Sequence, residues 1–479
     1  MNDSDGQERQ NEEARRRLRG PPGFRAHLMG IGGVGMAALA RLLAARGARV
    51  SGCDAAQNDL SRALERDGVR VHTGHDPAHV ADGVDAVIRS AAVPADHPEA
   101  LAAEARGLPV LTRGAVLPAL LEGRFSVAVG GTHGKTTTTA MIAQIARRAG
   151  RRPAFAIGGA VDALGGVAAD EGGPLIVEAD ESDGTLRLYE PDVAVVTNVD
   201  FDHMERFAGM DELAGVFRRF ARQARRRVIY GADNDRARAV CADLPNAVGF
   251  GFGPAAALRA SDRRARGLSQ TFEVEWDGRP LGRVSLPVPG EHNALNALAA
   301  MAAAAELGVA PEVSREALDG FHPARRRLEC VVDGSVRVFS DYAHHPAEIR
   351  ALIASLRDLP RRRLVAVFQP HRYTRTRALG AELPAAFDGV DELVLAPVYA
   401  ASEAPVEGGR AEDLLRRFGT PPRVPVTLAP DLRAAWDRIR ARIGEGDVLL
   451  VIGAGDVERI ASWAAAWAAG AGGLQPPNP

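Results

Sequence analysis

The stretch FSVAVGGTHGKTTTT at residues 125–139 decides the fold of the central part of the chain. Its apolar start, residues 125–129, predicts a buried strand, and residues 136–149 predict a helix. Between them, glycines let backbone N–H groups turn toward an anion, the helix N-terminus adds the positive end of its dipole, and Lys135 supplies a cation. We therefore predict a phosphate-binding loop that consists of Gly130, Gly131, Thr132, His133, Gly134, Lys135, Thr136 and Thr137.

The loop is a variant of the usual phosphate-binding pattern. The first glycine of G-x-x-x-x-G-K-[ST] would fall at Val129, so the strict pattern is not met. Lys135 is nevertheless the single lysine of the sequence, and 58 of the 59 basic residues are arginine. A slim ammonium fits between phosphate oxygens, where a planar guanidinium does not fit equally well. The retained lysine favours a nucleotide site, in which we expect the Thr136 hydroxyl to bind Mg²⁺.

The composition is that of a globular chain with several domains. At 479 residues it is long enough for about three. The net charge of −2 gives no basic excess for nucleic acid or an acidic membrane surface, and no apolar run approaches the ~18 residues of a membrane span. We expect a cytoplasmic monomer or weak homodimer without nucleic-acid or membrane partners. The three cysteines form no CxxC pair, which favours a reducing compartment and no structural zinc.

A second glycine-rich loop follows the first apolar strand. Residues 30–35 read GIGGVG, which matches G-x-G-x-x-G, and the next predicted strand ends on Asp54, about 20 residues further on. This spacing predicts a dinucleotide or nucleotide-diphosphate site, because both need a tight turn and a close approach of the backbone to phosphate. We place this domain at residues 24–123, and we expect disordered tails at residues 1–23 and 468–479.

The central domain is predicted at residues 124–324. Apolar runs alternate there with helical stretches, which indicates a mainly parallel sheet. Two polar segments follow strands, EADESD at 178–183 and NVDFDH at 198–203, so both should face the crevice that holds the phosphate loop. Because Mg²⁺ prefers hard oxygen ligands and tolerates an imidazole, Glu178 and His203 are the predicted ligands.

Further polar clusters lie in the last third of the chain. Asn293 and Asn296 are three residues apart on one face of a predicted helix, where amides can pair with an adenine edge. A third domain is predicted at residues 325–467, with DYAHHP at 341–346 and PHRYTR at 370–375 after apolar strands. The like charges crowded in the second cluster would repel one another unless an anion joins them, which favours a ligand site.

These segments occur in the order seen in the Mur ligases, and the chain resembles that family over roughly residues 25–460. The shared segments are GIGGVGM, GTHGKTTT, EADESD, NVDFDHM, GEHNALNA, RRLE, DYAHHP and FQPHRYTRT. Each is moderately specific, and together they are very specific. The resemblance implies an α/β fold of three domains: a Rossmann-like UDP-binding domain, a central P-loop ATPase-like domain with a mainly parallel sheet, and a C-terminal Rossmann-like domain that binds an amino acid.

The resemblance implies roles for residues at matching positions. UDP-sugar contacts are implied for Gly32, Gly33, Val34, Gly35, Asp54 and Ser90. ATP contacts beyond the loop are implied for His292, Asn293, Asn296, Arg326, Asp341 and Tyr342. The amino-acid pocket is implied to contain Tyr342, His344, His371, Arg372 and Arg375. The implied Mg²⁺ ligands are Thr136, Glu178 and His203. Catalytic roles are implied for Lys135, His203, Arg326, His344 and His371.

The implied reaction is the ATP-dependent ligation of L-alanine to the carboxylate of UDP-N-acetylmuramate, with Mg²⁺, in peptidoglycan precursor synthesis. The carboxylate attacks the γ-phosphate to give an acyl phosphate, the amine of L-alanine attacks the acyl carbon, and ADP and phosphate are released. The attacking amine must be neutral, and the sequence does not choose between His344 and His371 as acceptor of its proton. One alternative is a sibling ligase that adds recycled tripeptide. Another is a nicotinamide-dependent oxidoreductase, which would leave GTHGKT without a purpose.

Several positions depart from the family pattern. Glu291 stands where arginine is usual, Ser340 where an aspartate often precedes DYAHHP, and Arg89 where serine is common. Some relatives carbamylate a lysine after the D-H-[LM] segment, but residues 205–231 contain no lysine, and a guanidinium that stays protonated does not form a carbamate. The missing lysine predicts activity that is independent of bicarbonate.

Overall fold

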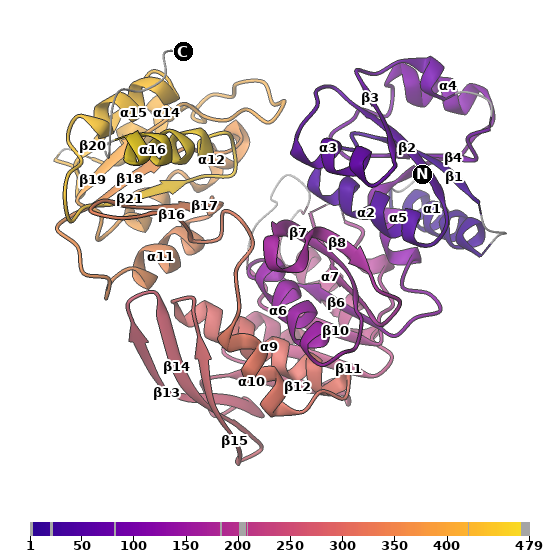
Figure 1. The fold of residues 1–479 in the computed structure, drawn as a ribbon, viewed down its shortest axis with the longest axis horizontal. Helices are drawn as coiled ribbons and strands as arrows, with labels where there is room; N and C mark the ends of the chain where they lie inside the picture. The colour runs from indigo at the N-terminus through magenta and orange to yellow at the C-terminus, as the bar shows by residue number, and fades with distance from the viewer. Residues whose placement is uncertain are drawn as a thin grey trace. The chain divides into compact units, whose positions relative to one another are not determined.

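A computed structural model describes residues 3–19, 23–80, 83–182, 184–200, 207, 209–419 and 421–470. The chain forms three α/β domains, one for each of three β-sheets (Figure 1). The predicted fold class is confirmed. By their internal contacts the residues separate into two compact units, of which the first comprises Met1–Arg263, Phe272–Ser285 and Asn293–His322. The second comprises Arg264–Thr271, Leu286–His292 and Pro323–Pro479.

The first sheet has five strands in the order β3-β2-β1-β4-β5, and all neighbours run parallel. The strands are β1 (Arg25–Met29), β2 (Arg49–Asp54), β3 (Arg70–Thr73), β4 (Ala86–Arg89) and β5 (Val110–Thr112). The strand order reverses at β1, so the loop after β1 lies at a switch point, where open α/β sheets bind ligands. The helices are α2 (Val34–Ala45), α3 (Asp59–Arg66), η1 (Pro77–His79, a 3-10 helix), α4 (Pro98–Ala105) and α5 (Arg113–Ala119).

The N-terminal residues form a helix, so the disordered tail predicted at residues 1–23 is wrong for most of its length. Helix α1 (Asp3–Leu18) packs on α5, and Ala14 is buried in this contact. The buried Asn11 side chain donates a hydrogen bond to the Ala115 carbonyl oxygen at 2.7 Å. The polar composition that indicated disorder therefore supplies specific hydrogen bonds that hold the helix on the first domain.

The central sheet has ten strands in the order β15-β14-β13-β12-β11-β10-β6-β9-β7-β8. Strand β6 runs parallel to both of its neighbours, β10 and β9, so the loop after β6 lies beside the carboxyl ends of both. Strands β7 and β8 pair antiparallel at one edge. The strands up to β12 are β6 (Ser126–Gly130), β7 (Ala154–Val161), β8 (Gly166–Asp170), β9 (Leu175–Glu178), β10 (Val193–Val196), β11 (Arg227–Gly231) and β12 (Ala247–Gly251). The helices are α6 (Lys135–Arg148), α7 (Met210–Arg222), α8 (Asp235–Cys241), α9 (Glu291–Glu306) and α10 (Pro311–Asp319).

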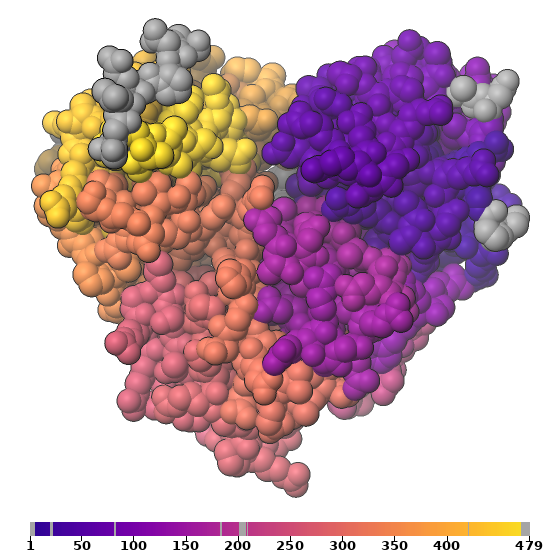
Figure 2. Space-filling model, in the orientation of Figure 1, coloured from indigo at the N-terminus to yellow at the C-terminus, as the bar shows by residue number. Residues whose placement is uncertain are grey.

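Three further strands complete this sheet as consecutive hairpins. They are β13 (Leu258–Arg266), β14 (Ser269–Trp276) and β15 (Arg279–Leu286), and neighbours are joined by two-residue turns. At the turn between β14 and β15, Asp277 and Gly278 have φ of +48° and +77°. Positive φ at both central residues is the type I′ geometry that matches the twist of a hairpin. Side chains of these strands reach the molecular surface (Figure 2).

The third sheet has six strands in the order β16-β17-β21-β18-β19-β20. The pair β16–β17 is antiparallel, and the other neighbours are parallel. The strands are β16 (Glu329–Asp333), β17 (Arg337–Asp341), β18 (Leu364–Phe368), β19 (Glu392–Leu395), β20 (Val426–Leu428) and β21 (Val448–Ile452). Strands β18 and β21 are completely buried, so the polar residues that follow them lie at the edge of a dry core.

The third domain is covered by six helices within the described residues. They are α11 (Pro346–Ser355), α12 (Tyr373–Leu379), α13 (Leu383–Ala386), α14 (Ala411–Arg417), α15 (Leu432–Arg440) and α16 (Glu458–Gly470). Helix α16 includes residues 468–470 of the tail that was predicted to be disordered, and residues 471–479 lie outside the described residues. Among the described helices of the whole chain, none combines the length and the apolar character of a membrane span.

A buried carboxylate at the start of β21 holds two arginines. The Asp447 side chain is inaccessible to solvent, and its Oδ2 lies 2.7 Å from the Nη2 atoms of both Arg362 and Arg363. Burial alone would raise the pKa of Asp447, but hydrogen bonds from the two guanidinium groups and from the Gly444 N–H lower it below its ordinary value. The charged form of this carboxylate therefore stabilises the fold.

We expect Asp447→Asn to lower the free energy of unfolding at pH 7 by about 2–4 kcal/mol, because the arginines lose their charged partner. A lowered pKa contributes stability above the unfolded value, so the difference from wild type should shrink as the pH falls below about 4. Urea unfolding followed by tryptophan fluorescence measures this. Asp388→Asn is the control, since Asp388 and Arg423 are 3.6 Å apart and mostly exposed. An equal loss in both variants would contradict the prediction.

Candidate functional site

The phosphate loop turns through two glycines that no other residue can replace without strain. Gly131 has φ of +133° and Gly134 has φ of +82°. A Cβ atom at Gly131 would lie 1.9 Å from Thr197 Oγ1, and one at Gly134 would lie 2.5 Å from Asn296 Oδ1. Gly134 is also the N-cap of α6, so the loop leads the chain directly into a helix N-terminus. The backbone N–H groups of such a loop and the helix dipole are elements that can bind an anion.

Residues after β10 hold the loop in this shape. The Thr197 hydroxyl donates to the His133 carbonyl oxygen at 2.6 Å, and the Asn198 side-chain oxygen accepts from the His133 N–H at 2.8 Å. The Thr132 N–H donates to the Asn198 carbonyl oxygen at 3.1 Å. The sequence placed the segment that begins at residue 198 on the same sheet edge as the loop, but it did not predict this bracing role.

Lys135 points back over the loop and forms a buried ion pair. Its Nζ donates to the Gly131 carbonyl oxygen at 2.7 Å and lies 2.8 Å from Glu181 Oε2. The Glu181 side chain is 1% exposed and that of Lys135 is 11% exposed. Burial lowers the pKa of Lys135, but the charge of Glu181, with smaller contributions from two further acidic residues of the segment, raises it above its ordinary value. Sequence reasoning did not single out Glu181, although the run EADESD contains it.

Thr136 and Glu178, two of the predicted magnesium ligands, lie together. The Thr136 hydroxyl donates to Glu178 Oε2 at 3.0 Å, and the Gly158 N–H donates to the same oxygen at 2.7 Å. A hydroxyl and a carboxylate side by side at a phosphate loop are the hard oxygen donors that suit Mg²⁺. The residues present therefore fit this ion. The third predicted ligand, His203, lies outside the described residues.

The helix α9 supplies the predicted adenine residues. Asn296 Nδ2 donates to Asn293 Oδ1 at 3.3 Å, and the Thr138 hydroxyl donates to Asn296 Oδ1 at 3.2 Å. Both amide side chains are largely buried and connect α9 to the helix of the phosphate loop. His292 belongs to the second compact unit, where its ring lies against Gly290. The prediction that these residues bind adenine remains a prediction.

The loop after β1 is closed by a carboxylate and an amide. The Gly32 N–H donates to Asp54 Oδ2 at 2.8 Å, and Asn58 Nδ2 donates to the Gly32 carbonyl oxygen at 3.0 Å. A Cβ atom at Gly35 would lie 3.0 Å from the guanidinium of Arg113. The predicted substrate residues Gly33, Val34 and Ser90 lie in the same region, at the start of α2 and after β4. Asp54 thus holds the loop, while its predicted contact with substrate remains untested.

In the second unit, Asp341 ends β17 with its carboxylate turned into the backbone. It accepts hydrogen bonds from the Leu328 N–H at 2.6 Å and the Ala343 N–H at 2.7 Å. Burial raises the pKa of Asp341 to about 6. Next to it, the guanidinium of Arg326 lies 5.0 Å from the centre of the Tyr342 ring and donates to the Gly455 carbonyl oxygen. The three predicted nucleotide residues of this domain therefore form one group.

The predicted amino-acid residues lie close together at the ends of β17 and β18. The rings of His344 and His371 are 6.2 Å apart, and Tyr342 lies edge-on to His344 at 5.6 Å. Arg375 Nη1 is 3.3 Å from His371 Nδ1. Burial, followed by the electrostatic effects of His344 and the nearby arginines, lowers the pKa of His371 to about 3. His371 is therefore neutral at physiological pH.

The hydrogen bonds of the two histidines assign different tautomers. His344 Nδ1 lies 3.1 Å from the Tyr342 carbonyl oxygen, which can only accept, so Nδ1 carries the proton and the lone pair is on Nε2. The Arg375 guanidinium can only donate, so the lone pair of His371 is on Nδ1 and its Nε2 carries the proton. Arg372, with φ of +66°, donates its N–H to the Tyr399 carbonyl oxygen at 2.8 Å and shapes the turn after β18.

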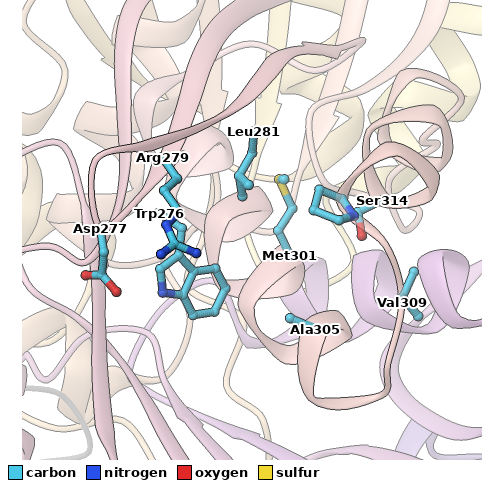
Figure 3. Close-up of a pocket in the computed structure, with 9 residues that line it drawn as sticks. Trp276, Asp277, Arg279, Leu281, Met301, Ala305, Val309 and Ser314 are labelled. Atoms are coloured by element: carbon cyan, nitrogen blue, oxygen red, sulfur yellow. The ribbon is translucent and has the colours of Figure 1, made fainter.

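A separate concave pocket of about 520 Å³ lies in the first unit between the β14–β15 hairpin and helices α9 and α10. The side chains of Trp276, Leu281 and Met301 face the same space (Figure 3). None of the residues that line it was predicted as a site residue, and its lining contains few groups that could do chemistry.

Three family models match the chain in succession. They are "Mur ligase family, catalytic domain" over residues 25–125, "Mur ligase middle domain" over residues 129–304 and "Mur ligase, glutamate ligase domain" over residues 326–455. Together these matches cover most of the chain, and they contain the phosphate loop, the loop after β1 and the residues after β17 and β18.

Relatives and solved structures match over nearly the whole length. The UDP-N-acetylmuramate–L-alanine ligase of Symbiobacterium thermophilum is 42% identical over 91% of this chain and 93% of its own. That of Kineococcus radiotolerans is 43% identical over 91% and 94%. The crystal structure of the UDP-N-acetylmuramate-alanine ligase from Thermotoga maritima has a TM-score of 0.79 at 29% identity, covering 92% and 97%. A murein peptide ligase from Psychrobacter arcticus has a TM-score of 0.70 at 24% identity, covering 95% and 100%, and shares the fold.

The buried ion pair at the phosphate loop leads to a direct test. We expect Glu181→Gln to lower the pKa of Lys135, because the charge that stabilises the ammonium is removed. Since the chain has a single lysine, protein labelled with ¹³C and ¹⁵N lysine gives one side-chain signal, and its titration by NMR reads this pKa directly.

Glu171→Gln serves as the control, because Glu171 forms a partly exposed pair with Arg147 at 2.8 Å. The lysine titration of this variant should match that of wild type. An unchanged lysine titration in Glu181→Gln would mean that the ion pair with Lys135 does not form in solution.

Proposed function

This chain belongs to the Mur ligase family, and we propose that it joins L-alanine to the carboxylate of UDP-N-acetylmuramate at the expense of ATP. The reaction releases ADP and phosphate and supplies a precursor of peptidoglycan. The observation that carries the proposal is the phosphate loop with Lys135 over it, in a chain more than 40% identical to alanine-adding ligases. Because ATP and the UDP-sugar are both nucleotide substrates, we propose that the reaction takes place in the cytoplasm.

The first chemical step needs two anions to meet. The muramoyl carboxylate attacks the γ-phosphate, and both carry negative charge, so the main task of the site is to neutralise charge. Lys135 is suited to this task because the surrounding carboxylates keep it protonated. On binding of ATP, its ammonium would exchange part of its contact with Glu181 for phosphate oxygens. Glu181 would then orient the lysine, while the loop N–H groups hold the phosphates.

Thr136, Glu178 and His203 would hold Mg²⁺, which supplies further positive charge at the phosphates when it is bound. The neighbouring hydroxyl and carboxylate oxygens of Thr136 and Glu178 support this assignment. Lys135 is paired with Glu181, and residues 205–231 contain no lysine that could be carbamylated. We therefore propose that no carbamate ligates the metal. Ligation should proceed without added bicarbonate.

The remaining contacts follow from the loops at the sheet edges. Gly32, Gly33 and Gly35 would approach the UDP diphosphate, with Arg113 beside them as a cation that the sequence did not indicate. The family resemblance also implies that Asp54 and Ser90 contact the UDP-sugar. For ATP, the proposed contacts beyond the loop are His292, Asn293, Asn296, Arg326, Asp341 and Tyr342. We also propose that the boundaries between the three domains follow residues 123 and 324.

The second step requires a base for the ammonium of L-alanine. His344 has its lone pair on Nε2, because Nδ1 donates to the Tyr342 carbonyl oxygen. The lone pair of His371 points at Arg375 instead, and its pKa of about 3 makes it a weak base. We assign the proton acceptor to His344 and a positioning role to His371, with Arg372 and Arg375 as the cations that attract the carboxylate of the amino acid.

The alternatives are not favoured. The murein peptide ligase from Psychrobacter arcticus shares the fold at 24% identity, whereas two alanine-adding relatives are 42% and 43% identical over 91% of the chain. A nicotinamide-dependent oxidoreductase has no use for a lysine-bearing phosphate loop.

The decisive assay follows phosphate release with UDP-N-acetylmuramate, ATP and Mg²⁺ in the presence of single amino acids or the recycled tripeptide. We expect L-alanine to give the largest kcat/KM. Lys135→Ala should lower kcat by about 10² or more, because one charge contact to the transition state is lost. Arg151→Ala removes a cation that bonds the Gly308 carbonyl oxygen, away from the loop, and should leave kcat unchanged. Tripeptide-dependent release without L-alanine-dependent release would refute the proposed substrate.

The assignment of the proton acceptor can be tested by a pair of variants. His344→Gln should lower kcat by about 10² or more and remove the acid limb of the pH profile, because the base is lost. His371→Gln should keep the acid limb above pH 5, since the pKa of His371 is about 3. Its main effect should be a higher KM for L-alanine. The reverse pattern would assign the proton to His371.

A further inference from the structure

A cluster of soft and borderline metal donors lies in the first domain and contains no residue proposed for ligation. His27 in β1, Cys53 in β2, His79 in η1 and Glu99 in α4 each offer one donor atom, and these four atoms lie within 4.8 Å of one another. His27, Cys53 and Glu99 are completely buried. The four residues come from four separate elements of the domain, of which β1, β2 and α4 are labelled in Figure 1.

The Glu99 carboxylate is the centre of the cluster. Its Oε1 lies 3.1 Å from His27 Nε2 and 3.2 Å from His79 Nδ1, and its Oε2 lies 3.1 Å from Cys53 Sγ. In a tetrahedral zinc site with bonds of 2.0–2.3 Å, neighbouring donor atoms are about 3.3–3.8 Å apart. The three distances to Glu99 are slightly shorter than these donor separations, and the remaining donor pairs lie within 4.8 Å. An ion that enters the cluster would therefore replace the hydrogen bonds to Glu99 and draw the other side chains inward.

The chemistry of the set also matches a particular class of ion. One sulfur, two imidazole nitrogens and one carboxylate oxygen are the ligand types of structural and catalytic zinc, and they are unsuited to Mg²⁺. A thiolate and a carboxylate together carry two negative charges, which balance a divalent cation in a buried place where excess charge is costly. On binding, the Cys53 thiol gives up its proton to solvent as the sulfur–metal bond forms.

We propose that His27, Cys53, His79 and Glu99 bind one Zn²⁺ or a similar borderline divalent transition metal. From the absence of a CxxC pair, the sequence predicted no structural zinc. The cysteine-spacing rule does not detect a site assembled from one cysteine and distant histidines. The structure brings together residues that are up to 72 positions apart in the sequence.

Neighbouring groups complete the site. His27 Nδ1 lies 3.0 Å from Ser51 Oγ, a bond that fixes the orientation of the ring and leaves Nε2 directed at the cluster. His75 Nδ1 lies 3.1 Å from both Cys53 Sγ and Glu99 Oε2, so this ring can serve as an alternative or fifth ligand. The side chains of His75 and His79 are 20% and 16% exposed, which gives an ion a path from solvent.

The ion would tie the site to the substrate loop. His27 lies three residues before Gly30, where the loop begins, and Cys53 directly precedes Asp54, which holds the Gly32 N–H. A metal that fixes β1 against β2 would therefore stabilise the ends of both strands from which the loop is built. The site thus has a structural role and needs no part in the ligation itself.

The test uses the full-length protein without nucleotide, stripped with a chelator and then titrated with Co²⁺ alone. We expect a sulfur-to-cobalt charge-transfer band and tetrahedral d–d bands that saturate at one equivalent. X-ray absorption of the zinc-loaded wild type, with excess Mg²⁺ present, should show one sulfur among the zinc ligands. A wild-type protein that binds no zinc, or that binds it through oxygen and nitrogen atoms alone, would overturn the proposal. This outcome does not depend on any variant.

Variants then locate the ion. Cys53→Ser should abolish the charge-transfer band, and His79→Ala should weaken cobalt binding by at least about 100-fold. The matched control is Cys241→Ser, because Cys241 is equally buried but belongs to no donor cluster among the described residues. It should keep the band. A band that survives in Cys53→Ser, or that disappears in Cys241→Ser, would place the ion elsewhere and reject the site.

Discussion

The central domain depends on one buried cation at the carboxyl edge of a parallel sheet. Lys135 lies beneath the surface with Glu181 as its partner, and removal of either would leave an uncompensated charge in a dry place. The pair is possible because β6 and β9 are parallel neighbours, so the loop after one strand meets the acidic segment after the other. The parallel pairing of β6 and β9 therefore places Lys135 beside Glu181, and this carboxylate keeps the lysine charged in the absence of phosphate.

The sequence predicts this loop well because its signal is local. Glycines, a lysine and a threonine lie within a few positions, and their conformational demands can be read without knowledge of the rest of the chain. The choice between Glu178 and Glu181 is different. Strand β9 ends at Glu178 and the chain turns there, so Glu178 reaches Thr136 while Glu181 turns inward to the lysine. No spacing rule predicts that turn.

Other misses have the same physical origin. The polar residues of α1 indicated disorder because their hydrogen-bond partners are distant in sequence. The carbonyl oxygen that accepts from Asn11, for example, belongs to Ala115, about a hundred positions away. The donors around Glu99 are likewise distant in sequence and converge only because β1 and β2 are adjacent. The sheet was predicted to be mainly parallel, and the antiparallel pair β7–β8 at its edge is settled by pairing with neighbours in the sheet more than by local pattern.

Backbone strain occurs in the third domain at turns that carry proposed binding residues. Arg326, Leu328 and Arg372 have φ of +60°, +48° and +66°, which costs non-glycine residues about 1–3 kcal/mol each. Hydrogen bonds offset this cost: Leu328 donates its N–H to the Asp341 carboxylate and Arg372 donates its N–H to the Tyr399 carbonyl. These strained turns present Arg326 to Tyr342 and place Arg372 beside His371. Such strain persists only where the surrounding structure fixes it, and it is consistent with the proposal that these turns position cations for a ligand.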